Sequence, residues 1–390
     1  MSDAAPLSRP ILAGVVTALV GFTSSFAVVL TGLDAVGANA AQAASGLLAV
    51  SLTMGLACVV LAWRYRIPIT VAWSTPGAAL LVATGTVEGG WSAAVGAFLI
   101  TAALILLTAL WPALGALIAR IPPSIAQAML AGVLLPLCLA PITGIVANPW
   151  GVVPVVITWL LFARLAPRWA VPLAFVAAAV VVAVSLIGEG APFDPALLLP
   201  RLEFTAPTFT VGALVGLALP LFIVTMASQN VPGIAIMRSF GYEVPWRPAM
   251  LVTGIGTALG ATAGGHTINL AAISAALAAS PDADPDPRRR WVAGVSTGAS
   301  YLVLAVFSAA LAALVVLAPA AVIPAVAGLA LFAAFGSAVQ QAIDDPNERI
   351  PAVVTFLVAA SGIAVLGVSA AFWALVAGLL VRTVLHTRRR

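Results

Sequence analysis

The sequence predicts an all-α polytopic membrane protein with fourteen transmembrane segments. Its 390 residues are 62% hydrophobic and 8% charged, with a mean hydropathy of +1.14, whereas soluble domains carry about 25% charged residues. The charges fall in short clusters, and the apolar stretches between them approach the roughly 20 residues that a helix needs to cross a bilayer. This composition excludes a cytosolic globular protein.

The predicted spans cover nearly the whole chain. The first is too long for the apolar region of a cleaved signal peptide, which is about 7 to 15 residues, so we interpret it as a span. The fourteen ranges are 11–33, 41–63, 69–87, 91–113, 122–142, 149–165, 169–187, 208–238, 246–262, 263–279, 291–317, 320–342, 350–367 and 369–386.

The arginines support this count, because positive residues near span ends prefer the cytoplasmic side. The chain has no lysine, and with fourteen alternating spans every arginine except Arg201 falls on one face. We therefore expect a bacterial inner-membrane protein with both termini cytoplasmic. The net charge of +4 indicates topology rather than nucleic-acid binding. The mixed-charge segment Asp282–Arg290 is expected to be a solvated cytoplasmic loop.

A short motif recurs seven spans apart. Ile121–Ala126 and Ile323–Ala327 both join an isoleucine–proline pair to alanine, at spans five and twelve. An odd repeat length makes the second copy enter the membrane from the opposite side, which predicts the 7+7 inverted repeat that many secondary transporters use. Alanine-rich helices that begin at proline are common, so this motif alone is weak support.

Span three does not resemble an ordinary helix. Ile69–Trp73 is rich in residues that favour strands, and Ser74-Thr75-Pro76 supplies helix-start residues with proline in the first turn. Five strand residues at about 3.3 Å and twelve helical residues at about 1.5 Å reach on the order of 35 Å, enough to cross a hydrocarbon core of about 30 Å. The helix would therefore begin near the membrane midplane.

Span ten, the third of the second half, predicts the same strand-to-helix design. Gly264 and Gly265 lie within Ala261–Asn269, ahead of a helix-like stretch from Leu270 to Ala279, although glycines here would also permit close helix packing. Non-helical backbone at membrane depth is tolerated only where protein encloses it or it lines a cavity. Two half-helix N-termini meeting there would favour an anion, and a carboxylate is the natural small ligand.

Polar residues inside other spans add to this site. His266 is the one group within the predicted spans that titrates near neutral pH, so it is a functional candidate, although a neutral histidine bonded to a backbone carbonyl would lock the break equally well. Ser228–Asn230 place three polar residues in span eight, where they contact a ligand or another helix. Phe22 and Phe26 share a helix face and are ordinary packing unless the ligand is aromatic.

Enzymatic and ATP-driven functions lack any sequence support. There is no phosphate-binding loop, no metal-ligand spacing and no nucleophile beside a base, so we predict no cofactor, no metal and no catalytic residue. Cys58 and Cys138 both lie in apolar stretches, as small core residues rather than a disulfide framework.

Three motifs carry a resemblance to a known family. They are Ile67-Pro68-Ile69-Thr70 with Ala72–Ala78 in span three, Ala227–Gly233 in span eight, and Gly264-Gly265-His266 with Asn269–Ile273 in span ten. Together they resemble the benzoate/proton symporter family, BenE, over nearly the whole chain. The resemblance implies a fold similar to that of uracil permeases and anion exchangers.

That fold contains a core domain and a gate domain. The resemblance implies a core made of residues 1–113 and 205–318 (spans 1–4 and 8–11) and a gate made of residues 114–204 and 319–390 (spans 5–7 and 12–14). Members often dimerise through the gate, which makes a gate-mediated homodimer one possible assembly.

The resemblance also implies site roles. It surrounds the substrate with Ser74, Thr75, Gly77, Thr267, Asn269, Gln229, Asn230, Phe22 and Phe26. The first four would bind the carboxylate through hydroxyl and backbone N–H groups, the two span-eight amides would shape the polar edge, and the phenylalanines would stack on the ring. Uracil permeases carry glutamates where this chain has Gln229 and either His266 or Asn269, so we predict that His266 takes part in proton coupling.

The prediction is a secondary active transporter that imports benzoate or a similar small carboxylate across the lipid bilayer by proton symport with alternating access. The alternatives are a transporter of another organic anion or of a nucleobase, a passive channel, and a non-transporting scaffold. A channel would lack saturable, proton-dependent uptake, and a scaffold would tolerate bulky substitution at Thr75 and Asn269.

Overall fold

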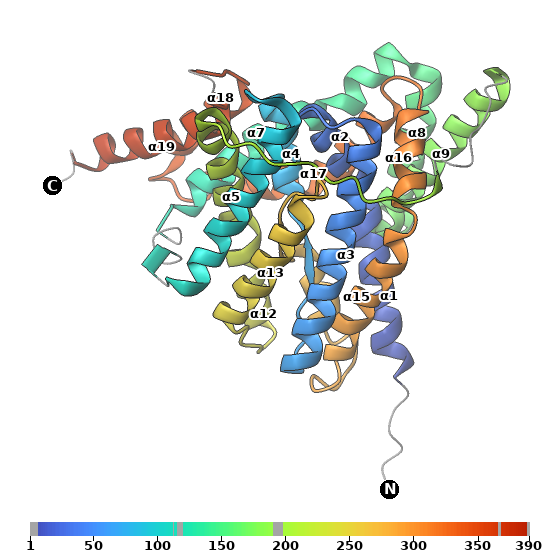
Figure 1. Ribbon diagram of the computed structural model, residues 1–390, viewed down its shortest axis with the longest axis horizontal. Coiled ribbons are helices and arrows are strands. Elements are labelled where there is room, and N and C mark those ends of the chain that lie inside the picture. The colour runs from blue at the N-terminus through green and yellow to red at the C-terminus, as the bar shows by residue number, and fades with distance from the viewer. Residues whose placement is uncertain (1–6, 112, 115–119, 190–197, 366–367, 388–390) are drawn as a thin grey trace, which may run out of the picture.

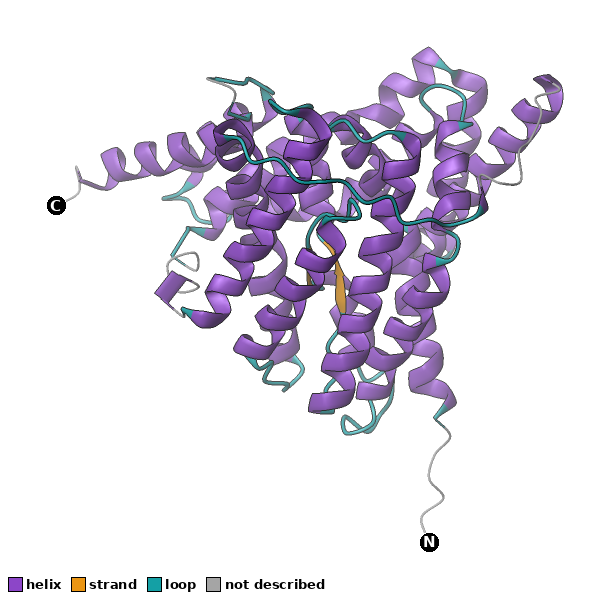
Figure 2. Ribbon diagram, in the orientation of Figure 1, coloured by secondary structure: helices purple, strands orange, loops and turns teal. Residues whose placement is uncertain are grey.

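Helices make up almost the whole molecule, and one pair of short strands lies near its centre (Figures 1 and 2). The computed structural model describes residues 7–111, 113–114, 120–189, 198–365 and 368–387. The elements before residue 190 are α1 (Ser8–Thr23), α2 (Phe26–Ala35), α3 (Ala40–Tyr65), β1 (Val71–Trp73), α4 (Thr75–Thr84), α5 (Gly90–Leu110), α7 (Pro123–Ala147), α8 (Pro149–Leu165), η1 (Pro167–Trp169) and α9 (Ala170–Glu189).

The second half repeats this helical character. Its elements are α10 (Val211–Ala213), η3 (Leu214–Ala218), α11 (Leu219–Thr225), η4 (Met226–Asn230), α12 (Val231–Ser239), α13 (Trp246–Ala261), β2 (Ile268–Leu270), α14 (Ile273–Ala279), α15 (Trp291–Ala305), α16 (Ser308–Val316), α17 (Val322–Ile343), α18 (Arg349–Ala360) and α19 (Ala370–Thr387). The segments η3 and η4 are π-helical turns within the eighth predicted span.

Several helices are long and apolar enough to cross a membrane. Within the described residues there are seven, or eight when α15 and α16, which meet at a 55° bend, count as one span. Shorter apolar helices accompany them at Thr75–Thr84, Pro149–Leu165, Arg349–Ala360 and Ala370–Leu385. The predicted multi-pass membrane protein is confirmed, while the count of fourteen and the inverted repeat stay predictions.

The strand-then-helix design of span three is confirmed. β1 ends at Trp73, Ser74 takes an extended conformation (φ −77°, ψ 90°), and its side chain accepts a hydrogen bond from the Gly77 N–H as the N-cap of α4. Pro76 lies in the first turn of α4, where a missing N–H costs no intrahelical bond. Local capping chemistry therefore starts this helix inside the fold rather than at its surface.

Span ten forms β2, which pairs antiparallel with β1 in the register Val71↔Leu270, Ala72↔Asn269 and Trp73↔Ile268. The helix that follows begins at Ile273, not at Leu270 as predicted, because Leu270 is held extended by its place in the strand pair. Gly264 has φ +86°, a conformation that residues with a Cβ rarely adopt. The predicted glycine break is thus confirmed.

The outer edges of the strand pair find side-chain partners. The Val71 N–H lies 3.0 Å from Cys58 Sγ, on α3. The Ile268 N–H donates to Thr257 Oγ1 on α13 at 3.1 Å, and the Leu270 N–H donates to Asn230 Oδ1 in η4 at 2.9 Å. Since lipid offers no hydrogen bonds, these partners allow extended backbone to exist at membrane depth.

The first predicted span is present as the apolar helical stretch Ser8–Ala35, but its helix is interrupted at Ser24 and Ser25, which the sequence analysis did not anticipate. It expected one helix over 11–33, but α1 ends at Thr23 and α2 begins at Phe26. Ser25 between them leaves the helical region (φ −149°, ψ 0°). At this break the Ser25 hydroxyl contacts Trp73 in β1 and Thr75 at the start of α4.

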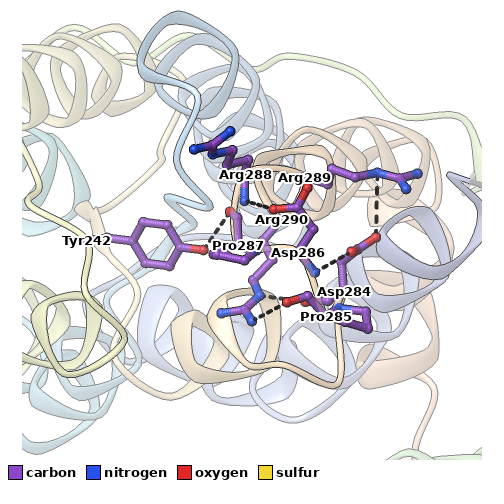
Figure 3. Close-up of polar contacts among 8 residues, drawn as sticks. All are labelled: Tyr242, Asp284, Pro285, Asp286, Pro287, Arg288, Arg289 and Arg290. Atoms are coloured by element: carbon purple, nitrogen blue, oxygen red, sulfur yellow. Dashed lines mark hydrogen bonds and ion pairs between the residues drawn. The ribbon is translucent and has the colours of Figure 1, made fainter. Parts of the chain in front are cut away.

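The loop after α14 is more ordered than a solvated connection (Figure 3). Arg290 is buried, and its guanidinium donates to the carbonyl oxygens of Asp284 at 2.7 Å and of Ala279, the last residue of α14, at 2.9 Å. The Tyr242 hydroxyl donates to the Pro287 carbonyl at 2.8 Å. Burial raises the pKa of Tyr242, and the charge of Arg290 opposes that rise. Pro285 to Arg288 are exposed, as expected of a solvated loop, whereas Asp284 and Arg290 are buried, because helix-end carbonyls need donors.

We expect Arg290→Ala to lower the thermal stability of the detergent-purified protein. The change strands buried carbonyl oxygens, and hydrogen bonds to a charged group contribute about 1.5–3 kcal/mol each. Arg288→Ala is the matched control, because its exposed side chain lies in the same loop. Equal apparent melting temperatures for the two variants would contradict this role.

Candidate functional site

The two broken spans meet where β1 ends and β2 begins. The Ser74 N–H donates to the Thr267 carbonyl oxygen at 2.9 Å, and His266 Nε2 lies 3.2 Å from the Ser74 carbonyl oxygen. All three residues are fully buried. The fold therefore brings together, from opposite halves of the chain, three residues that the sequence proposed for one site.

A threonine that the sequence analysis missed joins them. Thr225 Oγ1, at the end of α11, donates to Ser74 Oγ at 3.0 Å and lies 3.2 Å from Thr267 Oγ1. Its one sequence signal is its place four residues before Gln229, in the same apolar helix. Three hydroxyl groups from spans three, eight and ten thus form a buried cluster.

The N-terminus of α4 is already partly capped. The Gly77 N–H donates to Ser74 Oγ at 3.1 Å, and Pro76 has no N–H to offer. A Cβ on Gly77 would lie 2.7 Å from both Ser74 Oγ and Leu221 Cδ1, so glycine is required for this close packing. The sequence analysis assigned the Gly77 N–H to the substrate carboxylate. In this conformation it is bonded to the Ser74 hydroxyl instead.

The break in span one supplies another hydroxyl. Ser25 Oγ accepts from Trp73 Nε1 at 2.8 Å and from Thr75 Oγ1 at 3.1 Å. The sequence analysis did not single out Ser25, because it predicted one uninterrupted helix there. Thr75 is half-buried, so it sits at the margin of the buried cluster.

Aromatic rings adjoin these hydroxyls. Phe22 and Phe26 are stacked with ring centroids 6.1 Å apart, and both are buried. Phe22 meets Trp73 edge-on at 4.9 Å, and Phe26 meets Phe175 of α9 edge-on at 4.6 Å. The predicted pair therefore forms a wall beside Trp73, in geometries that aromatic rings prefer.

The amides of span eight behave differently from one another. Asn230 Oδ1 accepts the Leu270 N–H at 2.9 Å, and its Nδ2 donates to Met226 Sδ at 3.2 Å. Its amide thus supports β2 in this conformation, which confirms a bond across elements. Gln229 is half-buried. No hydrogen bond of its side chain occurs among the described residues.

His266 Nδ1 and Asn269 Oδ1 are among the buried polar atoms that lack a protein partner within the described residues. Because a carbonyl oxygen can only accept, His266 Nε2 must carry the hydrogen that bonds to Ser74, which leaves Nδ1 as a lone pair. His266 thus bonds to a backbone carbonyl, as the sequence analysis considered, and its Nδ1 can still bind a proton. Asn269 Nδ2 donates to the Leu270 carbonyl at 2.9 Å.

Full charges lie outside this site. The buried charged side chains among the described residues are Asp284, Arg290 and Glu348, and all three lie in loops or beside helix ends. The site itself offers hydroxyl groups, amides and the N-terminal dipole of α4. Such an arrangement suits a monovalent anion bound by hydrogen-bond donors, without a fixed cation.

Comparisons with known proteins agree with this chemistry. The BenE family model, described as benzoate membrane transport protein, matches residues 5–384. The chain is 38% identical over 378 residues to inner membrane protein YdcO of Escherichia coli, covering 96% of this chain and 95% of that one. It is 30% identical over 375 residues to the benzoate membrane transport protein of Acinetobacter baylyi, covering 96% and 94%.

Among solved structures, the transmembrane domain of a cyanobacterium bicarbonate transporter, BicA, superposes with a TM-score of 0.60 at 16% identity over 97% of both chains. This similarity shows a shared membrane-transporter fold. Together with the long apolar helices, these matches identify a multi-pass inner membrane protein.

We expect Asn230→Ala to destabilise the strand pair. It leaves the Leu270 N–H buried without a partner, which costs about 1–3 kcal/mol, and should lower the melting temperature and speed hydrogen exchange around β2. Ser228→Ala is the control, because within the described part of the chain that hydroxyl donates to the Val224 carbonyl, four residues earlier in the same span. If both variants exchange at the same rate, Asn230 does not hold β2.

Proposed function

The chain belongs to the BenE family of benzoate membrane transport proteins, and on this premise we propose that it imports benzoate, or a closely similar aromatic carboxylate, by proton symport with alternating access. The observation that carries the proposal is the buried junction of β1, α4 and β2. There, hydroxyl donors from Ser74, Thr225 and Thr267 gather within hydrogen-bond reach of one another.

The two ends of benzoate match two parts of this junction. Its carboxylate carries acceptors only, so it suits the hydroxyl hydrogen of Ser74. Thr75 and Thr267, whose hydroxyl groups here contact Ser25 and Thr225, would donate to the carboxylate when they turn from those partners. Its ring suits Phe22 and Phe26, where edge-on or offset contact contributes about 0.5–1.5 kcal/mol beyond burial. Asn269 and Gln229 would border the carboxylate end.

Proton symport offsets an electrical penalty. An anion that enters against an inside-negative potential of 100 mV loses about 2.3 kcal/mol per charge. One accompanying proton removes that loss, and each unit of inward pH gradient adds about 1.4 kcal/mol of driving force. His266 Nδ1, a buried lone pair next to the hydroxyl cluster, is the group that we propose to carry the proton.

Alternating access requires this closed site to open. Ser74, Thr267 and His266 are fully buried, so substrate reaches them only after one part of the molecule moves. We propose that the core (1–113 and 205–318) moves against the gate (114–204 and 319–390), in an elevator-like or rocking motion. The edge-on contact of Phe26 with Phe175 would lie on that sliding interface.

The proposed topology has fourteen spans and cytoplasmic termini. Each predicted span has a helical counterpart when β1–α4 and β2–α14 each count as one span and α15–α16 as another. The antiparallel pairing of β1 with β2 is the relation expected of inverted repeats. The apolar gate surface, on which Trp150 and Ile187 are more than four-fifths exposed, would meet lipid or a second copy.

Purified protein in liposomes tests this function directly. With an inward proton gradient we expect saturable uptake of labelled benzoate that a protonophore abolishes. Protein-free liposomes are the control, because the uncharged acid crosses bilayers unaided. Nicotinate, acetate and uracil serve as competitors, and we expect uracil not to compete. Competition by uracil alone would replace benzoate with a nucleobase, and unsaturable flux without counterflow would indicate a channel.

His266→Gln tests the proton carrier. Glutamine retains an N–H donor for the Ser74 carbonyl but cannot bind a proton. We expect counterflow of benzoate to persist, while accumulation loses its rise with external acidity, about tenfold per pH unit for one coupled proton. Unchanged pH dependence of accumulation would rule out His266 as the carrier.

A further inference from the structure

The hydroxyl of Ser74 has both of its acceptor positions filled. A hydroxyl group has two lone pairs and one hydrogen. Ser74 Oγ accepts from the Gly77 N–H at 3.1 Å and from Thr225 Oγ1 at 3.0 Å. The hydrogen of Ser74 is therefore the only part of this hydroxyl left for a further bond, and within the described residues the hydroxyl takes part only as an acceptor.

The direction of the neighbouring bond follows from the same count. Thr225 has one hydroxyl hydrogen, which it donates to Ser74. Its 3.2 Å contact with Thr267 Oγ1 must therefore use the hydrogen of Thr267. The three hydroxyl groups form a directed chain from Thr267 through Thr225 to Ser74.

We propose that Thr225 is a positioning residue that imposes this direction and so makes Ser74 an obligatory hydrogen-bond donor to the substrate. The inference rests on the proposed function and explains how the proposed site would select an anion. A carboxylate accepts a hydrogen bond from either oxygen, whereas an amide also presents N–H donors that a saturated Ser74 cannot accept. Selection against such donors needs no cation in the site.

The geometry of Thr225 differs from that of a threonine that only packs. Buried threonines in apolar helices commonly donate to a carbonyl of the preceding turn, as Thr253 does to Ala249 at 2.9 Å. The bonds of Thr225 instead run to spans three and ten. Because Thr225 and Thr253 are both fully buried, they form a matched pair for substitution.

The test compares Thr225→Val, Thr225→Ser and Thr253→Val in liposomes. Valine keeps the size of threonine and removes the hydroxyl, whereas serine keeps the hydroxyl. For each variant the measurements are the KM and maximal rate of benzoate uptake, and the ratio of inhibition constants for benzamide and benzoate. Melting temperatures with and without benzoate, in detergent, report folding and binding independently of transport.

For Thr225→Val we expect benzoate KM to rise about tenfold with a smaller change in maximal rate, because one charge-assisted bond loses its orientation. The ratio of benzamide to benzoate inhibition constants should fall by a similar factor, since Ser74 gains a free acceptor. Thr225→Ser should restore both values, and Thr253→Val should match the wild type.

Several results would overturn the relay. One is an unchanged ratio in folded Thr225→Val, and another is a Thr225→Ser variant that behaves like Thr225→Val. A third is a Thr253→Val variant whose melting temperature rises with benzoate as little as that of Thr225→Val. Wild-type protein that neither takes up nor is stabilised by benzoate would instead overturn the proposed function, and the relay with it, before any variant is compared.

Discussion

The need to satisfy every backbone hydrogen bond without water governs this structure. A helix meets that need within itself, but two spans here abandon the helix at Val71–Trp73 and Ile268–Leu270. Each strand pairs with the other, and the outward N–H groups of Val71, Ile268 and Leu270 find sulfur or oxygen on three neighbouring helical elements. Neither strand could lie at membrane depth alone, so the two halves of the chain must assemble for either to exist.

That constraint also determines the chemistry of the site. Where β1 ends and β2 begins, backbone groups and the start of α4 need partners, and Ser74, Thr225, Thr267 and His266 supply them. The same groups are hydrogen-bond donors in a region that holds no full charge. The structural requirement thus places a neutral group of hydroxyl residues here, and their chemistry suits a monovalent anion.

Local chemistry was predictable from sequence, and long-range pairing was not. Ser74-Thr75-Pro76 carries the residues of a helix start wherever it lies, so the cap and the strand before it could be predicted. The late start of α14 depends on Leu270 pairing with Val71, almost two hundred residues away, which no local pattern records.

The break at Ser25 and the role of Thr225 were missed for related reasons. Gly21 and the run Thr23-Ser24-Ser25 lie at the break between α1 and α2, but the apolar stretch continues on both sides, so the sequence analysis treated it as one helix. Thr225 looks like any threonine in an apolar helix until its partners on spans three and ten are known. Candidate residues on the broken spans could be named from their composition, whereas residues that brace them from other helices need the fold.

The distribution of contacts suggests which part of the molecule moves as a unit. The bonds around β1 and β2 connect spans one, three, eight, nine and ten, so separating these spans would strand buried polar groups at about 1–3 kcal/mol each. The proposed gate meets the core at apolar contacts, as where Phe26 meets Phe175, and at a buried hydrogen bond from Ser369 Oγ to the Gly216 carbonyl oxygen at 2.6 Å. The ion pair of Arg168 with Asp282 that also crosses this boundary is well exposed and therefore weak. Sliding along that boundary would break the Ser369 hydrogen bond but none of those around β1 and β2, so moving the core as a rigid unit with its closed site has the smaller polar cost.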